Sequence, residues 1–163
     1  FWTTLAFRLE LAPLHYGSTV AGLFGLVGVV GASAAPLVGR LADRSSPRDT
    51  VGIGLAVLAL SYVLFLLFGH TIAGLVAGVI LVDAGMQVVG VSNQARIYRL
   101  AEAAHSRLNT VYMVAYFAGG SVGSALGVWA WGQWRWTGVC VVALAAVALA
   151  IALYARGRRR LAA

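Results

Sequence analysis

The chain has 163 residues, of which 61% are hydrophobic, 12 are basic and 5 are acidic. Soluble domains carry charge on about a quarter of their residues, and the mean hydropathy of +0.87 is far above that of a water-soluble protein. The composition excludes an ordinary soluble enzyme, a disordered tail and a nucleic-acid module, because too few polar residues remain to cover a soluble surface.

The elements predicted from the N-terminus onward are apolar helices. Residues 1–7 look like the end of a helix cut through its middle, with Arg8 and Glu10 just outside the membrane. Long segments with almost no charge follow, and a bilayer core takes about 20 apolar residues per helix. We therefore predict an all-α membrane protein with five transmembrane helices plus a partial sixth. The five helices are expected at residues 17–41, 50–68, 72–95, 108–131 and 136–155.

The basic residues predict how these helices are oriented. Ten of the twelve arginines lie in alternate connections and at the C-terminus: Arg40, Arg44, Arg48, Arg96, Arg99, Arg107, Arg156, Arg158, Arg159 and Arg160. The remaining connections hold only Arg8 and Arg135. Cytoplasmic loops are enriched in arginine and lysine, so we expect the C-terminus to be cytoplasmic. The net charge of +7 is then a topology signal, and we expect no nucleic-acid partner because the charge forms no basic stripe.

Small residues gather on two of the predicted helices. Gly28 and Gly31 lie on the helix at 17–41, and Gly119, Gly123 and Gly127 form two overlapping GxxxG steps on the helix at 108–131. Membrane helices associate through small residues that let their backbones approach closely. These glycines are therefore predicted to be packing faces, either in fixed contacts or at an interface that slides.

One acidic residue lies near the midpoint of the predicted helix at 72–95. Asp83 is followed at helical spacing by Gln87 and Gln94, which share its face. A carboxylate at this depth costs at least about 2.5 kcal/mol on insertion scales. It must therefore be protonated, paired or exposed to a wet cavity. Asp83 either takes up and releases a proton or makes a structural bond to a neighbouring helix.

The next predicted helix carries a companion polar stripe. Asn109, Tyr112 and Tyr116 follow helical spacing and could present an amide and two hydroxyl groups to a cavity. A tyrosine stripe can equally serve helix packing or anchoring at the membrane interface.

Side chains for catalysis or metal binding do not form a pattern in this sequence. His15, His70 and His105 lie in three different connections, so no pair has the spacing of metal ligands. We expect no metal, no cofactor and no enzymatic activity, because no nucleophile and base are paired either.

One connection carries a recognisable motif. Residues 39–48 have the sequence Gly-Arg-Leu-Ala-Asp-Arg-Ser-Ser-Pro-Arg. This segment resembles the cytoplasmic loop motif of the major facilitator superfamily, G-x-L-A-D-R-x-G-R-R/K. Gly39, Leu41, Asp43, Arg44 and Arg48 match it, together with Ala42. Ser and Pro replace the Gly and Arg that follow the D-R-x of the motif, as is typical of the degraded copy in the second half of these proteins.

Further segments resemble the late helices of one branch of that family. Residues 92–98, 107–113 and 116–127 are similar to those of bacterial sugar-efflux-like and drug:proton antiporter members. The resemblance implies that residues 1–163 are a fragment, a single bundle from the C-terminal half of a twelve-helix fold, running from the end of the seventh helix to the twelfth. Asp43 and Arg44 would then help to latch one conformational state, or the arginines of this loop would only follow the topology rule for cytoplasmic loops.

The resemblance also implies a function. We expect a secondary active transporter of the bacterial inner (plasma) membrane that exports a small organic compound in exchange for protons by alternating access. Its partners would be the lipid bilayer, the missing N-terminal six-helix half, the substrate and protons. The alternatives are sugar or metabolite uptake by symport or uniport, and a membrane scaffold that transports nothing.

Overall fold

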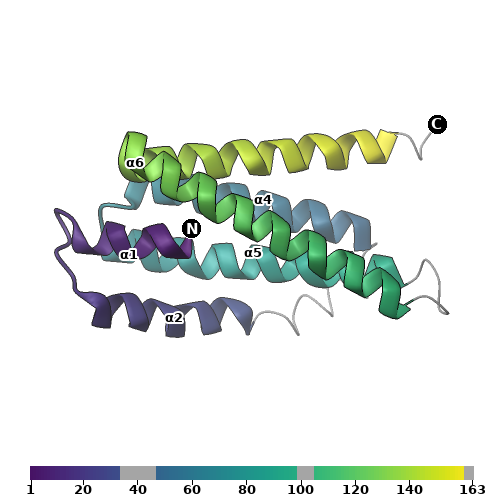
Figure 1. Cartoon of the computed structure of the whole chain (residues 1–163), viewed down its shortest axis with the longest axis horizontal. Helices are drawn as coiled ribbons and strands as arrows, with labels where there is room; N and C mark the ends of the chain where they lie inside the picture. Colours follow the sequence, from purple (N-terminus) through teal and green to yellow (C-terminus); the bar gives the residue numbers. More distant parts are fainter. Residues whose placement is uncertain (34–46, 99–104, 160–163) are drawn as a thin grey trace.

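The computed structural model describes residues 1–33, 47–98 and 105–159, and within these ranges every regular element is helical. The helices are α1 (Trp2–Glu10), α2 (Ser18–Ala32), α4 (Pro47–Phe68), α5 (Ile72–Tyr98) and α6 (His105–Arg159). They run roughly along one common direction and form an elongated bundle (Figure 1). The expected all-α fold is confirmed for the described part of the chain.

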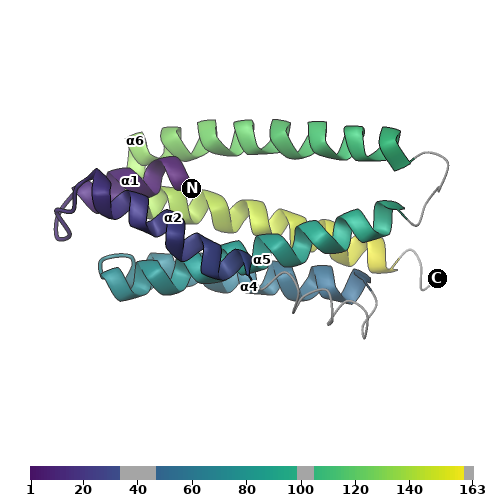
Figure 2. The same cartoon turned by 90° about the horizontal axis from the view of Figure 1, so that it is seen from below.

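The α6 helix folds back on itself at a sharp kink. Trp134 has φ −132° and ψ 17°, and Arg135 has φ 53° and ψ −144°, so both residues leave the helical conformation. The chain therefore reverses between the first arm of α6 (residues 105–133) and the second arm (residues 136–159), as Figure 2 shows. Two helices were expected here, at 108–131 and 136–155, and the kink lies in the gap between them.

Length and apolar composition make three of the described helices candidates for crossing a membrane. They are Asp49–Phe68, Ile72–Tyr98 and the kinked His105–Gly157, which has enough residues for two crossings. The segment Thr19–Gly31 is a shorter apolar helix. The first helix was expected at 17–41, and its last part, residues 34–41, lies outside the described residues. These lengths fit a chain that crosses a membrane several times.

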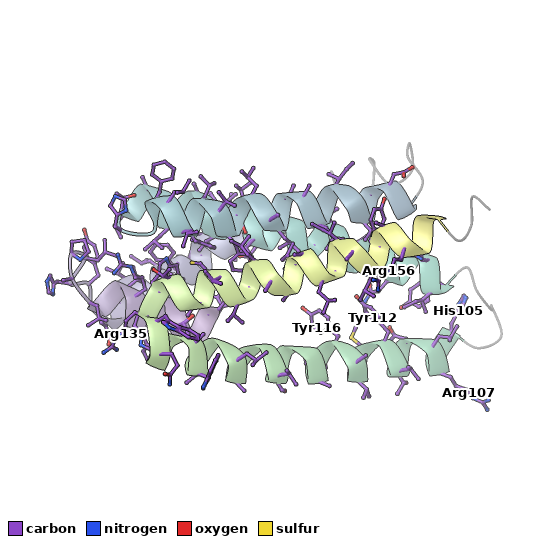
Figure 3. The ribbon with its side chains drawn as sticks, turned by 90° about the horizontal axis from the view of Figure 1, so that it is seen from above. His105, Arg107, Tyr112, Tyr116, Arg135 and Arg156 are labelled. Atoms are coloured by element: carbon purple, nitrogen blue, oxygen red, sulfur yellow. The ribbon has the colours of Figure 1, made fainter. Side chains whose placement is uncertain are left out.

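Charged side chains lie at the two ends of the bundle. Figure 3 shows Arg135 at the kink, and Arg107 and Arg156 at the opposite end. Arg8 lies at the same end as Arg135, because its Nε donates a 2.9 Å hydrogen bond to the carbonyl oxygen of Gly69 in the turn after α4. Arg8 and Arg135 thus lie at one end and Arg107 and Arg156 at the other, which agrees with the alternation predicted from the sequence.

Glycines bring α4 and α5 into close contact. A methyl group at Gly54 of α4 would lie 2.7 Å from a side-chain carbon of Val89, and one at Gly78 of α5 would collide with the ring of Phe65. A methyl group at Gly85 would lie 2.9 Å from Leu58. These two helices form the tightest seam of the bundle because small residues allow their backbones to approach.

A second packed region joins α1, α4 and α6 at the end of the bundle that holds the kink. We call it the junction and define it by Arg8, Phe65, Gly69 and Trp136. The indole Nε1 of Trp136 donates a 2.9 Å hydrogen bond to the carbonyl oxygen of Phe65, and the two rings meet edge to face with centroids 5.7 Å apart. Both side chains are buried.

Candidate functional site

A large cavity lies between the first arm of α6 and the rest of the bundle. Its volume is about 1180 Å³, and residues from all five described helices line it. Most of its wall is apolar, with polar groups at a few places. Spaces lined mostly by apolar side chains with a few polar groups are typical of binding sites for small organic molecules, which span about 300–1,000 Å³. This space is larger, and Phe1, the first residue of the sequence, lies in its wall.

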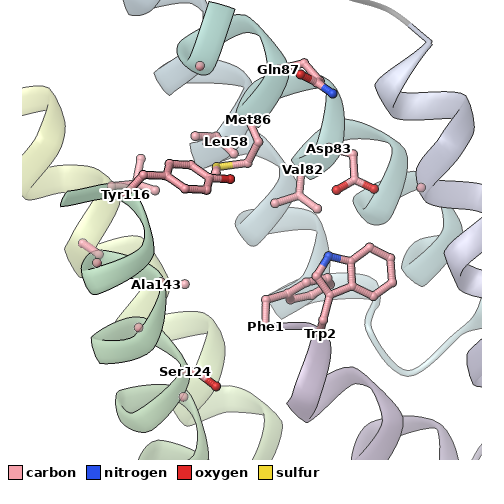
Figure 4. A pocket seen from close by; sticks show the side chains of 18 of the residues that line it. Phe1, Trp2, Leu58, Val82, Asp83, Met86, Gln87, Tyr116, Ser124 and Ala143 are labelled. Atoms are coloured by element: carbon pink, nitrogen blue, oxygen red, sulfur yellow. The ribbon is translucent and has the colours of Figure 1, made fainter. Parts of the chain in front are cut away.

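The α5 side of the cavity carries the polar stripe predicted from the sequence. Asp83, Gln87 and Gln94 all line the cavity. In Figure 4 the Asp83 and Gln87 side chains project from the same stretch of α5. Their spacing of four and seven residues keeps them on one face of a helix with 3.6 residues per turn. The structure thus brings together three of the predicted residues.

The first arm of α6 contributes the second stripe. Tyr112 and Tyr116 line the cavity, and their ring centroids are 6.3 Å apart. Figure 3 shows both side chains pointing from this arm toward the interior of the bundle. In Figure 4 the Tyr116 ring extends from α6 in the direction of Met86 of α5, which also lines the cavity. The polar stripes of two helices therefore meet in one space.

Asn109 differs from this expectation. Its Oδ1 accepts a 3.2 Å hydrogen bond from the hydroxyl group of Tyr98, and it is not among the residues that line the cavity. Although Asn109 has the helical spacing of the tyrosine stripe, it lies near the start of α6, where the end of α5 is close enough to bond it.

The Asp83 carboxyl lies against α2. A methyl group at Gly28 would lie 2.6 Å from Asp83 Oδ2, and one at Gly31 would lie 2.7 Å from Asp83 Cβ. In the part of the chain that the structure describes, no hydrogen bond or ion pair reaches this carboxyl. The two α2 glycines that were expected to pack therefore lie against Asp83, the acidic residue of the described cavity lining.

The α6 glycines lie in a different environment. Gly119, Gly123 and Gly127 line the cavity. A methyl group at Gly119 or Gly123 would meet no described atom within 4 Å, and one at Gly127 would only touch Thr4 at 3.9 Å. No described helix covers this face, so the packing role expected for it stays a prediction.

Several lining residues were not singled out from the sequence. Tyr62 of α4 and Ser124 of α6 line the cavity, and Trp2 lies opposite Asp83 in Figure 4. Tyr62 is the one tyrosine in the predicted helix at 50–68. Its phenol ring, which follows Ser61 in an otherwise apolar stretch, was the signal that could have identified it.

Most residues of the predicted loop motif lie outside the described part of the chain. Gly39, Leu41, Asp43 and Arg44 lie outside the described residues, and the structure describes only the backbone of Arg48, at the start of α4. Their expected role in latching a conformational state stays a prediction.

The chain is similar to a known family and to curated transporters. The family model of the Major Facilitator Superfamily matches residues 1–162. YgaY of Escherichia coli, which is described as an uncharacterized transporter, is 38% identical over 131 residues, which are 80% of this chain and 33% of YgaY. The "Probable transporter SCO4007" of Streptomyces coelicolor is 43% identical over 138 residues, covering 80% of this chain and 32% of that protein. No solved structure matches.

The chain thus spans about a third of the length of the curated relatives that it matches. The match to the family model covers nearly every residue, and the apolar helical bundle with its large cavity agrees with it. The chain belongs to the major facilitator superfamily of membrane transporters.

Proposed function

We propose that this chain is the C-terminal half of a twelve-helix secondary transporter that exports a small organic compound in exchange for protons. The observation that carries this proposal is the position of Asp83 in the wall of the cavity of about 1180 Å³. A carboxyl group inside the membrane is costly and is most often part of a proton or substrate pathway. Here it shares the cavity with amide and hydroxyl groups that can bind a polar part of a substrate.

The cavity wall also favours certain substrates. Its described lining contains the Asp83 carboxyl but no arginine, lysine or histidine. An anionic compound would meet no compensating charge there, and burying an unpaired charge is strongly unfavourable. The described half of the cavity is therefore suited to neutral or cationic organic molecules with an apolar body.

The two halves would enclose this cavity between them. The glycine face of the first arm of α6, with Gly119 and Gly123, is open in the described structure. We propose that the N-terminal half covers this face and that the two halves rock about the cavity. In this scheme the arginine-rich end and the C-terminus lie in the bacterial cytoplasm, and Asp43 and Arg44 contact the other half there.

Everted membrane vesicles containing the full-length transporter test the proposal. When respiration acidifies the vesicle interior, adding a substrate of an antiporter releases protons, and a pH-sensitive dye records this release. A panel of neutral and cationic organic compounds should give at least one signal with the wild type. The same compound should give none with Asp83→Asn at equal expression, because the amide cannot carry the proton.

The competing functions predict other results. A symporter for sugars or metabolites would instead draw protons into right-side-out vesicles when the compound is added outside. A uniporter or a scaffold would move no protons with any compound in either orientation, and of these two only the uniporter would carry the compound itself across the membrane. A wild-type signal that persists unchanged in Asp83→Asn would remove this residue from the coupling mechanism.

A further inference from the structure

The helices α2 and α5 are in close contact beside Asp83. At Gly31, a methyl group would lie 2.7 Å from Asp83 Cβ and also 2.7 Å from the carbonyl oxygen of Ile80. The carbonyl belongs to the α5 backbone and cannot rotate away. Any larger residue at position 31 would therefore have to push the two helices apart.

One turn earlier in α2, the same seam meets the carboxyl group itself. A methyl group at Gly28 would lie 2.6 Å from Asp83 Oδ2 and 3.3 Å from the ring of Trp2. Oδ2 is the end of a flexible side chain, so the carboxyl could turn away from α2 while both helices keep their places. The missing side chain at Gly31 thus allows the two helices to approach closely. The missing side chain at Gly28 allows the carboxyl to point toward α2.

We propose that Gly28 and Gly31 are positioning residues that hold the Asp83 carboxyl in a notch of α2, at the edge of the cavity. The inference rests on the proposed function only for the role of the carboxyl as a proton carrier. The notch concerns only the position of the carboxyl, and this position can be measured without a substrate.

The groups around the notch determine how far the Asp83 carboxyl is shielded from water. From α2 the described residues present no ionisable side chain, and α1 presents the Trp2 ring. Tyr62 of α4 and Tyr112 and Tyr116 of α6 are the titratable groups that line the cavity beside Asp83. A carboxyl held in the notch is shielded on the α2 side, whereas one turned into the cavity is more open to water.

Two carbodiimides can distinguish these positions in the full-length transporter. The apolar reagent dicyclohexylcarbodiimide modifies carboxyl groups that face apolar surroundings, and a water-soluble carbodiimide modifies those that water reaches. Mass spectrometry of the peptide that contains Asp83 gives the extent of each reaction. The ratio of the water-soluble to the apolar reaction then measures the direction of the carboxyl, and Asp83→Asn shows the background.

We expect Gly28→Ala to raise this ratio about fivefold, because turning the carboxyl out of the notch reduces its desolvation. The matched control is Gly22→Ala on the same helix, where a methyl group would meet no described atom within 4 Å. Its ratio should equal that of the wild type. A ratio for Gly28→Ala that also equals that of the wild type would overturn the proposal.

A second pair of variants covers the case in which Gly28→Ala does not fold. If Asp83 Oδ2 is the obstacle, adding Asp83→Ala to Gly28→Ala removes it, and expression and thermal stability should return. Failure of this rescue would also overturn the proposal. The proposed function is tested separately, since unchanged proton release in Asp83→Asn would refute the coupling role and leave the notch intact.

Discussion

The junction and the cavity use aromatic and polar side chains in opposite ways. At the junction, Trp136 is only 8% exposed and its indole N–H is bonded to the carbonyl oxygen of Phe65. In the cavity wall, Tyr116 is 48% exposed, and the Asp83 carboxyl has no bonded partner among the described residues. The polar group of Trp136 is thus satisfied inside the bundle, whereas the Asp83 carboxyl in the cavity wall has no such bond among the described residues.

The same contrast holds for the glycines. At Gly54, Gly78 and Gly85 of the α4–α5 seam an added methyl group would collide with a neighbouring helix, whereas Gly119 and Gly123 face open space. Glycine therefore serves close packing in the first region, whereas in the second it lies on a face that no described helix covers. Substitutions matched between the two regions can test this difference.

The largest effect is expected from Trp136→Ala. The substitution removes a buried ring that contacts Phe65 and leaves the carbonyl oxygen of Phe65 without its indole donor. Replacing a buried aromatic residue by alanine costs about 3–5 kcal/mol. The thermal unfolding temperature in detergent should fall sharply. Trp129→Ala, at a ring that is 53% exposed at the same end of the bundle, should change it little, and equal losses would contradict the junction.

A smaller effect is expected from Gly78→Ala. The methyl group would collide with the ring of Phe65, and overpacking of this kind costs about 1–3 kcal/mol. Gly90→Ala lies on the same helix, but on its cavity face with nothing within 4 Å. It should leave stability unchanged or raise it by about 0.5–1 kcal/mol, because alanine favours a helix over glycine. Thermal melts that rank the two variants in the opposite order would contradict the described seam.

The smallest effect is expected from Arg8→Ala. It removes the hydrogen bonds that Arg8 donates to the carbonyl oxygens of Gly69 and Ala12. A typical intramolecular hydrogen bond contributes about 0.5–1.5 kcal/mol net, and at these part-buried and exposed sites water can replace the guanidinium as donor. We expect a modest fall in the unfolding temperature and no change in the carbodiimide ratio at Asp83. A change in that ratio would show that the junction and the notch are coupled.

Helical periodicity predicted much of the site. The spacing of Asp83, Gln87 and Gln94 placed them on one face, and the spacing of Tyr112 and Tyr116 did the same on the next helix. The turn between α4 and α5 and the kink in α6 followed from charges and from the interruption of apolar sequence. These features are local, so a single sequence contains the information that determines them.

Contacts between helices could not be predicted in the same way. Gly28 and Gly31 were expected to pack, but nothing in their spacing identified Asp83 as the neighbour, because this depends on the rotation and depth of two separate helices. Asn109 shows the same limit, since its bond to Tyr98 depends on how two helix ends meet. The open face at Gly119 is a third example of this limit. GxxxG spacing predicts a face of small residues but does not identify the helix that packs against it.

The central claim is that Asp83 carries the coupling proton, and proteoliposomes containing the full-length transporter test it most directly. With a compound that passes the vesicle screen, proton-driven transport and substrate exchange across the membrane without a proton gradient should be compared in Asp83→Asn. We expect proton-driven transport to be lost while exchange continues, because the cavity remains but the proton carrier does not. Proton-driven transport at the wild-type rate in Asp83→Asn would contradict the claim.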